Sequence, residues 1–237
     1  MTTSHFRIAI DGPVAAGKGT IARLVASKLG YLYVDTGAMY RATAYVATQK
    51  KVSLENEDEV VQMLQSVKIE LRNPNEMEKD GRLTTVLLDG EDISWKIRTE
   101  QMSQGSSKVA KLAKVRAELV KHQQKIALSQ DVVMEGRDIT FRVLPDAELK
   151  IYLTASDTVR GKRRYLELQI RGEIASFEEV YKDLLLRDEQ DMHRTIDPLH
   201  IEPDAWVIDT SDLSIDKVVD MIVTRVAIMK SHSNKQK

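Results

Sequence analysis

The stretch that most limits the possible folds is "FRIAIDGPVAAGKGTIARLVASKLG", residues 6–30. An apolar run that suits a buried strand leads into a glycine-rich turn. Helical spacing follows from Lys18 to Leu29, and Gly30 is a suitable C-terminal cap. A strand, a glycine-rich loop and a helix in this order predict the start of a parallel α/β sheet.

The glycine-rich loop carries the pattern of a phosphate-binding loop. Gly12, Gly17 and Lys18 fit G-x-x-x-x-G-K, and the small residues let backbone N–H groups close around phosphate oxygens. The helix N-terminus favours negative charge, and the lysine supplies a cation. We therefore predict that the loop binds the phosphates of a nucleoside triphosphate with Mg²⁺. The predicted phosphate-binding residues are Gly12, Pro13, Val14, Ala15, Ala16, Gly17, Lys18, Gly19 and Thr20.

We predict no direct protein ligand for the Mg²⁺ ion. In the simplest form of the pattern a hydroxyl follows the lysine at once, whereas here Gly19 intervenes and the hydroxyl comes at Thr20. The ion is expected to bind through nucleotide phosphates and water, with Thr20 and Glu135 as the candidate contacts.

The rest of the chain predicts further alternation of strands and helices, interrupted by an antiparallel hairpin around "RNPNEMEKDGR". Ser156 and Ser176 are suitable N-caps, and Glu179 completes a capping box with Ser176. The expected strands are 6–10, 31–35, 67–71, 83–89, 132–138, 148–154 and 205–209, and the expected helices are 18–29, 38–49, 55–65, two within 99–130, 157–170, 177–194 and 214–230.

These elements predict one α/β domain with a parallel core flanked by helices. Because no low-complexity linker separates the hairpin from its neighbours, we expect an inserted lobe rather than a tethered domain. The expected parts are a core (5–37, 131–155 and 204–230), a lobe (38–130) with an antiparallel insert (67–95), a lid (156–187) and a disordered tail (231–237).

Composition excludes several classes of protein. The chain has 35 Lys and Arg against 36 Asp and Glu, so it lacks the positive excess typical of nucleic-acid-binding domains. It has no cysteine, which excludes disulfides and thiolate metal sites, and its five histidines show no ligand spacing. No apolar segment is long enough to predict a membrane span, so we expect a soluble, cytoplasmic protein.

Two short stretches place charged residues where ligands bind in α/β folds. In "DTGAMYR", Thr36 follows a predicted strand and Arg41 lies one turn into the next helix, so a second anionic group could be held there. In "MEGRD", Glu135, Arg137 and Asp138 follow a buried strand, where an acid can reach Mg²⁺ through water and an arginine can bind phosphate.

Two arginine-rich helix faces flank the turn "RGEIAS" and predict a lid that closes on a phosphoryl group. If the phosphate loop did not precede them, these arginines would be explained equally well by two surface helices rich in salt bridges. The first face comprises Arg160, Arg163 and Arg164, and the second comprises Arg187, Asp191 and Arg194.

The chain resembles the bacterial-type cytidylate kinases, of the P-loop nucleoside monophosphate kinase family. The resemblance spans residues 7–229 and includes "IAIDGPVAAGKGT", "DTGAMYRA", "LDGEDIS", "IRTEQMSQGSSKVAKLAKVR", "EGRD", "LPDAELKIYLTAS", "RRYLEL" and "RDEQDMHR". It implies a parallel core, a lid and a monophosphate-binding lobe with a small antiparallel sheet. It also implies transfer of a phosphoryl group from ATP to CMP or dCMP with Mg²⁺, in pyrimidine metabolism, by a monomer.

The resemblance also implies roles for particular residues. Lys18, Arg137, Asp138, Arg163 and Arg187 would be catalytic. The ATP side would comprise residues 12–20 with Arg160, Arg163 and Arg164, and the acceptor side would comprise Thr36, Arg41, Ser107, Arg116, Arg137, Asp138, Arg187, Asp191 and Arg194. Among these, Ser107, Arg116 and Arg194 would recognise cytosine, Asp191 the sugar, and Arg41, Arg137 and Arg187 the acceptor or transferring phosphate, with Asp138 bridging through its arginine contacts.

The chain departs from this family pattern at two places. After "EGRDI" the family usually has Gly-Thr-Val-Val before Phe-Pro-Asp, whereas this chain has Thr140, Phe141, Arg142, Val143 and Leu144. In the phosphate loop, Ala15 stands where many members carry glycine.

Other functions remain open from the residues alone. A kinase for another small acceptor, such as UMP, AMP or shikimate, would share the loop. A nucleotide-binding switch would share it too, although the chain contains neither Asp-x-x-Gly nor Asn-Lys-x-Asp and a switch has no use for the lid arginines. The charge balance disfavours a nucleic-acid ATPase.

Overall fold

The computed structural model describes residues 5–78, 80–170 and 172–235. The chain forms two compact units. The first unit contains residues 5–7 and Tyr31–Met134, and the second contains Ile8–Gly30 and residues 135–235. None of the helices in these described stretches combines the length and the hydropathy that a membrane span needs.

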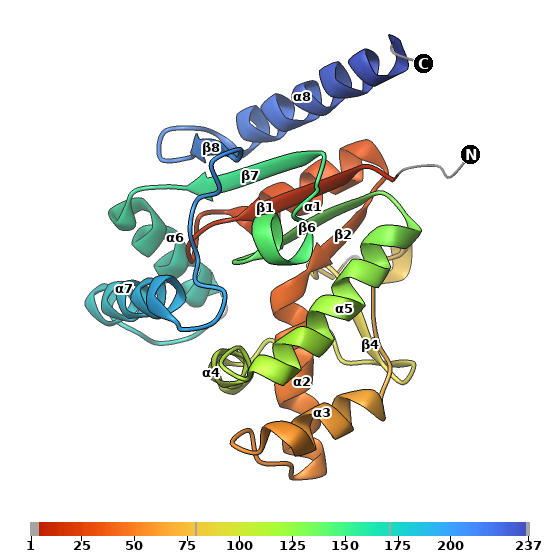
Figure 1. Cartoon of the computed structure of the whole chain (residues 1–237). Helices are drawn as coiled ribbons and strands as arrows, with labels where there is room; N and C mark the ends of the chain where they lie inside the picture. Colours follow the sequence, from red (N-terminus) through yellow and green to blue (C-terminus); the bar gives the residue numbers. More distant parts are fainter. Residues whose placement is uncertain (1–4, 79, 171, 236–237) are drawn as a thin grey trace. The chain divides into compact units, whose positions relative to one another are not determined.

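The larger sheet has five strands in the order β2-β6-β1-β7-β8 (Figure 1). β1 pairs with β7 in parallel, with Ile8 opposite Leu149, and β7 pairs with β8 in parallel. This sheet, with its helices, confirms the predicted α/β class. The strands are β1 (Arg7–Asp11), β2 (Leu32–Asp35), β6 (Val132–Gly136), β7 (Leu149–Thr154) and β8 (Trp206–Asp209).

In the second unit, apolar strand residues form the core beneath the phosphate loop. The side chains of Ile8, Ile10, Ile151 and Leu153 are fully buried. Helix α1 (Lys18–Leu29) packs against α8 (Ile215–Lys235), and Gly30 ends α1 with a left-handed backbone, as predicted. The loop therefore leaves a rigid strand and enters a well-packed helix.

Two further helices of the second unit pack against each other: α6 (Asp157–Ile170) and α7 (Phe177–His193) (Figure 1). The predicted capping box is present, because the Ser176 hydroxyl accepts from the Glu179 N–H and the Glu179 carboxylate accepts from the Ser176 N–H. The packing is close at Gly161, where a Cβ atom would lie 2.7 Å from the Tyr181 ring.

The first unit is mainly helical. Helix α2 (Thr36–Lys50) packs closely on α4 (Glu100–Val109), since a Cβ at Gly105 would lie 2.7 Å from the Ala44 Cβ. Helix α3 (Glu57–Gln65) packs on α5 (Ala113–Ser129). The tract predicted as two helices within residues 99–130 is therefore confirmed.

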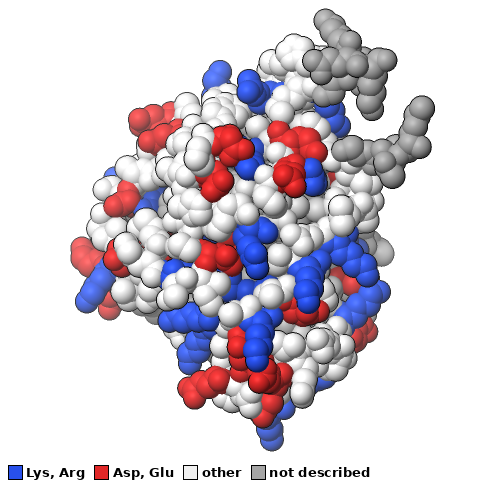
Figure 2. Space-filling view, in the orientation of Figure 1, with Lys and Arg blue, Asp and Glu red and all other residues white. Residues whose placement is uncertain are grey.

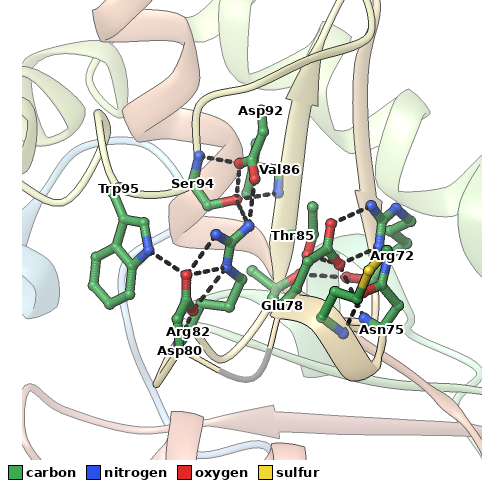
Figure 3. A network of polar contacts seen from close by, with 12 residues as sticks. Arg72, Asn75, Glu78, Asp80, Arg82, Thr85, Val86, Asp92, Ser94 and Trp95 are labelled. Atoms are coloured by element: carbon green, nitrogen blue, oxygen red, sulfur yellow. Dashed lines mark hydrogen bonds and ion pairs between the residues drawn. The ribbon is translucent and has the colours of Figure 1, made fainter.

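The predicted hairpin of the first unit is a three-stranded antiparallel sheet of β3 (Ile69–Arg72), β4 (Thr85–Leu88) and β5 (Glu91–Asp92). A short 3-10 helix, η1 (Glu76–Glu78), and a polar network fill the connection (Figure 3). Sequence patterns missed β5, because two residues are too few to show alternation.

Helix α8 continues to Lys235, into the stretch 231–237 for which the sequence predicted a disordered tail. No glycine or proline occurs between Ser214 and Lys235, so nothing in this stretch stops the helix. The Ser231 hydroxyl also donates to the Ile228 carbonyl. Residues 236–237 lie outside the described residues.

Candidate functional site

The phosphate loop joins β1 to α1 in the second unit and has an unusual backbone. Gly17 has φ of 89°, and a Cβ atom at Gly12 would lie 2.0 Å from the Leu153 carbonyl oxygen, so both positions require glycine. Ala15 also has a left-handed backbone, with φ of 58°. This alanine therefore adopts a conformation that glycine adopts with less strain, at the position where the family pattern often has glycine.

Lys18 is the buried cation of the loop. Its Nζ donates to the Pro13 carbonyl at 2.8 Å. The pKa of Lys18 is lowered to about 7, mainly by burial and also by the nearby Arg137, whereas Glu135 and Asp191 act in the opposite direction. Phosphate oxygens beside Nζ would stabilise the charged form of Lys18. The ammonium group is therefore suited to bind an anionic ligand.

A buried ion pair ties this loop to α6 and α7. Asp188 accepts from the Val14 N–H at 3.0 Å and pairs with Arg160. Arg160 donates to the Val14 carbonyl at 2.9 Å, and also to Asp157 and the Ala155 carbonyl. Both side chains of the pair are about 5% exposed (5% and 6%), so they form a structural link to the loop.

Sequence reasoning missed Asp188, although it lies inside the motif "RDEQDMHR". Arg160 was predicted to contact ATP, but its guanidinium is held by protein groups, and that contact stays a prediction. The other two arginines of this face also have protein partners: Arg163 donates to Thr210 through its hydroxyl (2.9 Å) and carbonyl (2.7 Å). Arg164 pairs with Glu167 at 3.0 Å.

The second predicted face lies beside Arg137. The Arg137 Nε donates to Asp191 Oδ2 at 2.7 Å. Burial alone would raise the pKa of Asp191, but Arg137, Arg187 and Arg194 hold it below its usual value. Burial likewise opposes the charged form of Arg137, and Asp191 raises its pKa above the usual value. The structure thus brings together four of the predicted residues, namely Arg137, Arg187, Asp191 and Arg194.

Asp11 is a second buried acid whose contacts sequence reasoning missed, although it opens the motif "DGPVAAGKGT". Its carboxylate is fully buried and accepts from the Ile139 N–H at 3.0 Å, the Thr140 N–H at 2.8 Å and the Thr140 hydroxyl at 2.7 Å. Burial raises the pKa of Asp11, against these hydrogen bonds, and Asp138 raises it further. Asp138 itself is buried.

In the first unit, Asp35 organises the start of α2. Its carboxylate accepts from the Ala38 N–H at 2.9 Å and pairs with Arg41 at 2.8 Å. Burial would raise the pKa of Asp35, but Arg41 and Arg98 lower it below its usual value. Arg98, in "IRTE", is a second cation that acts on Asp35, and sequence reasoning missed it. The predicted Thr36 is buried as the first residue of α2.

Ser107 and Arg116 lie on α4 and α5 of the first unit. Arg116 is 2% exposed, lies 5.8 Å from the Tyr40 ring centroid and donates to the Ala110 carbonyl at 3.3 Å. The Ser107 hydroxyl donates to the Ser103 carbonyl at 3.4 Å. This guanidinium is therefore buried and oriented by an aromatic face.

The Mg²⁺ candidates also belong to defined elements: Thr20 lies in the first turn of α1, and Glu135 lies in β6, close enough to act on the pKa of Lys18. Within residues 5–78, 80–170 and 172–235, no group of three or more His, Cys, Asp or Glu side chains is placed to hold a metal ion. The Thr20 hydroxyl and the Glu135 carboxylate supply oxygen atoms, the kind of donor that Mg²⁺ prefers.

Comparisons of the sequence with known proteins identify one family. The family model described as "Cytidylate kinase" matches residues 8–228. The chain is 46% identical to the cytidylate kinase of Geobacillus sp. (strain WCH70), over 93% of this chain and 96% of that protein. It is 44% identical to the cytidylate kinase of Bacillus cereus (strain ATCC 10987 / NRS 248), over 93% and 95%.

Among solved structures, the chain is similar to an uncharacterized protein from Eubacterium ventriosum ATCC 27560. The TM-score is 0.53, with 12% identity over 94% of this chain and 99% of that one. At this identity the likeness concerns the fold alone.

Proposed function

Because the chain belongs to the cytidylate kinase family, we propose that it transfers the γ-phosphoryl group of ATP to CMP or dCMP, giving ADP and CDP or dCDP. The observation that carries this proposal is the match over residues 8–228 together with a phosphate loop that holds a buried lysine. Mg²⁺ would neutralise charge between the β- and γ-phosphates.

In the proposed reaction, an oxygen of the acceptor phosphate forms a bond to the γ-phosphorus. The bond from that phosphorus to the β,γ-bridging oxygen breaks, and ADP leaves with the electron pair. The protein supplies no covalent nucleophile. Its task is to place the two phosphates in line and to neutralise the charge that spreads over the transferring group.

Lys18 and the loop N–H groups would bind the ATP phosphates, and Arg163 and Arg164 would contribute from α6. Arg137 and Arg187 would bind the acceptor phosphate or the transferring group. The ion pair with Asp191 supports this role for Arg137, because it fixes the guanidinium while leaving other N–H donors for phosphate. Helices α6 and α7 would act as the lid.

The acceptor nucleotide would be bound by Thr36 and Arg41 at its phosphate and by Ser107, Arg116 and Arg194 at its base. Cytosine has two acceptors, N3 and O2, that match hydroxyl and guanidinium donors. The burial of Arg116 supports a role in specificity, since a base without matching acceptors would leave a buried cation poorly solvated.

Small nucleotides are proposed as the partners, with no nucleic acid or membrane. Figure 2 shows basic and acidic side chains interspersed on the face that it displays, in keeping with a net charge of -1.

The test is a coupled ADP-release assay with ATP, Mg²⁺ and each of CMP, dCMP, UMP, AMP and GMP. Fast turnover with CMP and dCMP alone is expected. Turnover with AMP or UMP in place of CMP would reassign the acceptor, and ATP binding without turnover on any nucleotide would favour a switch. Arg116→Ala should raise the KM for CMP much more than the KM for ATP, and equal changes would make Arg116 a packing residue.

A further inference from the structure

The segment that departs from the family pattern has an unusual structure. Residues Ile139–Val143 form a single-turn π-helix, η2, in which the Val143 N–H donates to the Asp138 carbonyl at 3.2 Å and the Leu144 N–H donates to the Ile139 carbonyl at 2.8 Å. Single π-turns often occur at functional sites. Because Asp11 holds the start of this turn by three hydrogen bonds, its position is fixed relative to the end of β1.

Two side chains of η2 contact the connection that follows α7. The Phe141 ring lies 4.1 Å from the His200 ring between centroids, at an interplanar angle of 37°. The Arg142 Nε lies 3.8 Å from Asp197 Oδ2. These contacts join a fixed turn to the segment 194–200, which begins at Arg194, the last residue of the second predicted face.

The connection that follows α7, residues 194–200, is folded around Arg194. The Arg194 guanidinium donates twice to the Asp197 carbonyl, with an Nε distance of 2.7 Å. Asp197 has a left-handed backbone, with φ of 46°, which a residue with a β-carbon adopts only under constraint. The direction of the Arg194 side chain therefore depends on how Asp197 is held.

The far end of the connection is also anchored. The Leu199 N–H donates to the Asp191 carbonyl at 2.8 Å, and Leu199 is buried. His200 forms hydrogen bonds with the Pro198 carbonyl at 2.9 Å and with Glu202 Oε1 at 2.7 Å. The Phe141 ring thus packs on a residue whose own orientation is fixed.

We propose that Phe141 and Arg142 are positioning residues that set the orientation of Arg194 for the acceptor nucleotide, acting through His200 and Asp197. The inference rests on the proposed function, in which Arg194 binds the acceptor. Phe141 carries most of the effect because it is a ring contact with a fixed partner. Arg142 carries less, because its side chain is 51% exposed and its ion pair is long.

The experiment compares steady-state constants of Phe141→Ala and Arg142→Ala with the wild type. Phe141→Ala should raise the KM for CMP about fivefold to tenfold, while kcat and the KM for ATP change less than about twofold. Arg142→Ala should raise the KM for CMP about twofold. Arg225→Ala is the matched control, since Arg225 is an exposed arginine of α8, and it should leave all constants unchanged.

A double-mutant cycle separates positioning from general damage to the fold. His200→Phe keeps a ring beside Phe141 and should keep the KM for CMP within about twofold of the wild type. Phe141→Ala combined with His200→Ala should raise this KM no further than the larger single effect. Additive effects, or a KM for ATP that rises as much as that for CMP, would overturn the proposal.

Hydrogen exchange supplies a readout that does not depend on the substrate. In Phe141→Ala the amide of Leu199 should exchange faster than in the wild type, and unchanged exchange would overturn the proposal. A wild type that is inactive on every nucleotide would overturn the proposed function. An active wild type with an unchanged KM in Phe141→Ala would overturn this inference alone.

Discussion

Two arginine–carboxylate networks in this protein use the same chemistry in different surroundings. In the second unit, Arg160 and Asp188 are buried and hold both polar groups of the Val14 backbone. In the first unit, the network of the small sheet is partly exposed, with Asp80 at 40% exposure (Figure 3). It consists of Arg72, Glu78, Thr85, Asp80, Arg82, Asp92, Ser94 and Trp95.

This difference in burial decides how much stability is lost when one partner of such a pair is removed. A buried charge that loses its partner has no water to replace it, so removing one half is far more damaging than removing both. An exposed charge that loses its partner is solvated again, and salt already weakens the attraction. The comparison therefore predicts large effects around Val14 and small ones in the sheet of β3, β4 and β5.

The largest effect is expected for Asp188→Ala. It leaves Arg160 buried without its carboxylate and the Val14 N–H without its acceptor, so the free energy of unfolding should fall by about 3–5 kcal/mol. Urea denaturation measures this change. The double variant Arg160→Met with Asp188→Leu should lose less than the single variant, and an equal or greater loss would contradict the argument.

A smaller loss is expected for Asp11→Ala, which leaves the N–H groups of Ile139 and Thr140 without an acceptor. The free energy of unfolding should fall by about 2–3 kcal/mol. The pKa of Asp11 is raised in the folded protein, so its contribution is complete below pH 3.8 and decreases as pH rises through the raised value. The stability advantage over Asp11→Asn should therefore shrink with rising pH, and a growing advantage would contradict the assignment.

Lys18 is a buried cation like Arg160, but its hydrogen bond goes to the Pro13 carbonyl rather than to a carboxylate. It therefore tests the same comparison for a buried charge that has no carboxylate partner in that bond. With a pKa of about 7, Lys18 is mostly neutral at a pH of about 8, and bound phosphate should raise this pKa. ATP binding should then take up close to one proton, measured by calorimetry in buffers of different protonation enthalpy. Lys18→Met should abolish the uptake, and an undiminished uptake would assign the proton to another group.

The smallest effect is expected for Glu78→Gln in the partly exposed network of the small sheet. The pKa of Glu78 is lowered to about 2, mainly by Arg72 and then by the Asn75 N–H, so the stabilising contribution is complete above pH 4.5 and is lost as pH falls toward 2. The variant should shift the thermal midpoint slightly at neutral pH, and about 1 M NaCl should remove the shift. A shift that persists in salt would show that packing, not charge, is involved.

Sequence patterns could predict the fold because each main element has a local signal. The loop spacing, the Gly30 cap and the Ser176 capping box all act over a few residues, and the structure confirms them. The contact of Arg137 with Asp191 joins residues 54 positions apart, so no local pattern could show it. Asp11 and Asp188 were missed for the same reason: their acceptor roles appear only when distant backbone N–H groups are brought to them.

The partners of the predicted arginines were equally invisible in the sequence. Helical spacing grouped Arg160, Arg163 and Arg164 correctly on one helix, but spacing does not show which guanidinium is buried. Arg194, expected in the last turn of α7, lies just beyond His193 with extended backbone. Its orientation depends on Asp197, whose left-handed backbone has no sequence signal.

The double hold on Val14 has a mechanical consequence. The N–H of this residue is bound by α7 and its carbonyl by α6, so the bases of both helices are attached to the phosphate loop. If α6 and α7 act as the proposed lid, a movement that keeps the loop intact would pivot at the Arg160–Asp188 pair. The parts of α6 and α7 beyond that pair would then move, and the turn at residues 172–176 would move furthest.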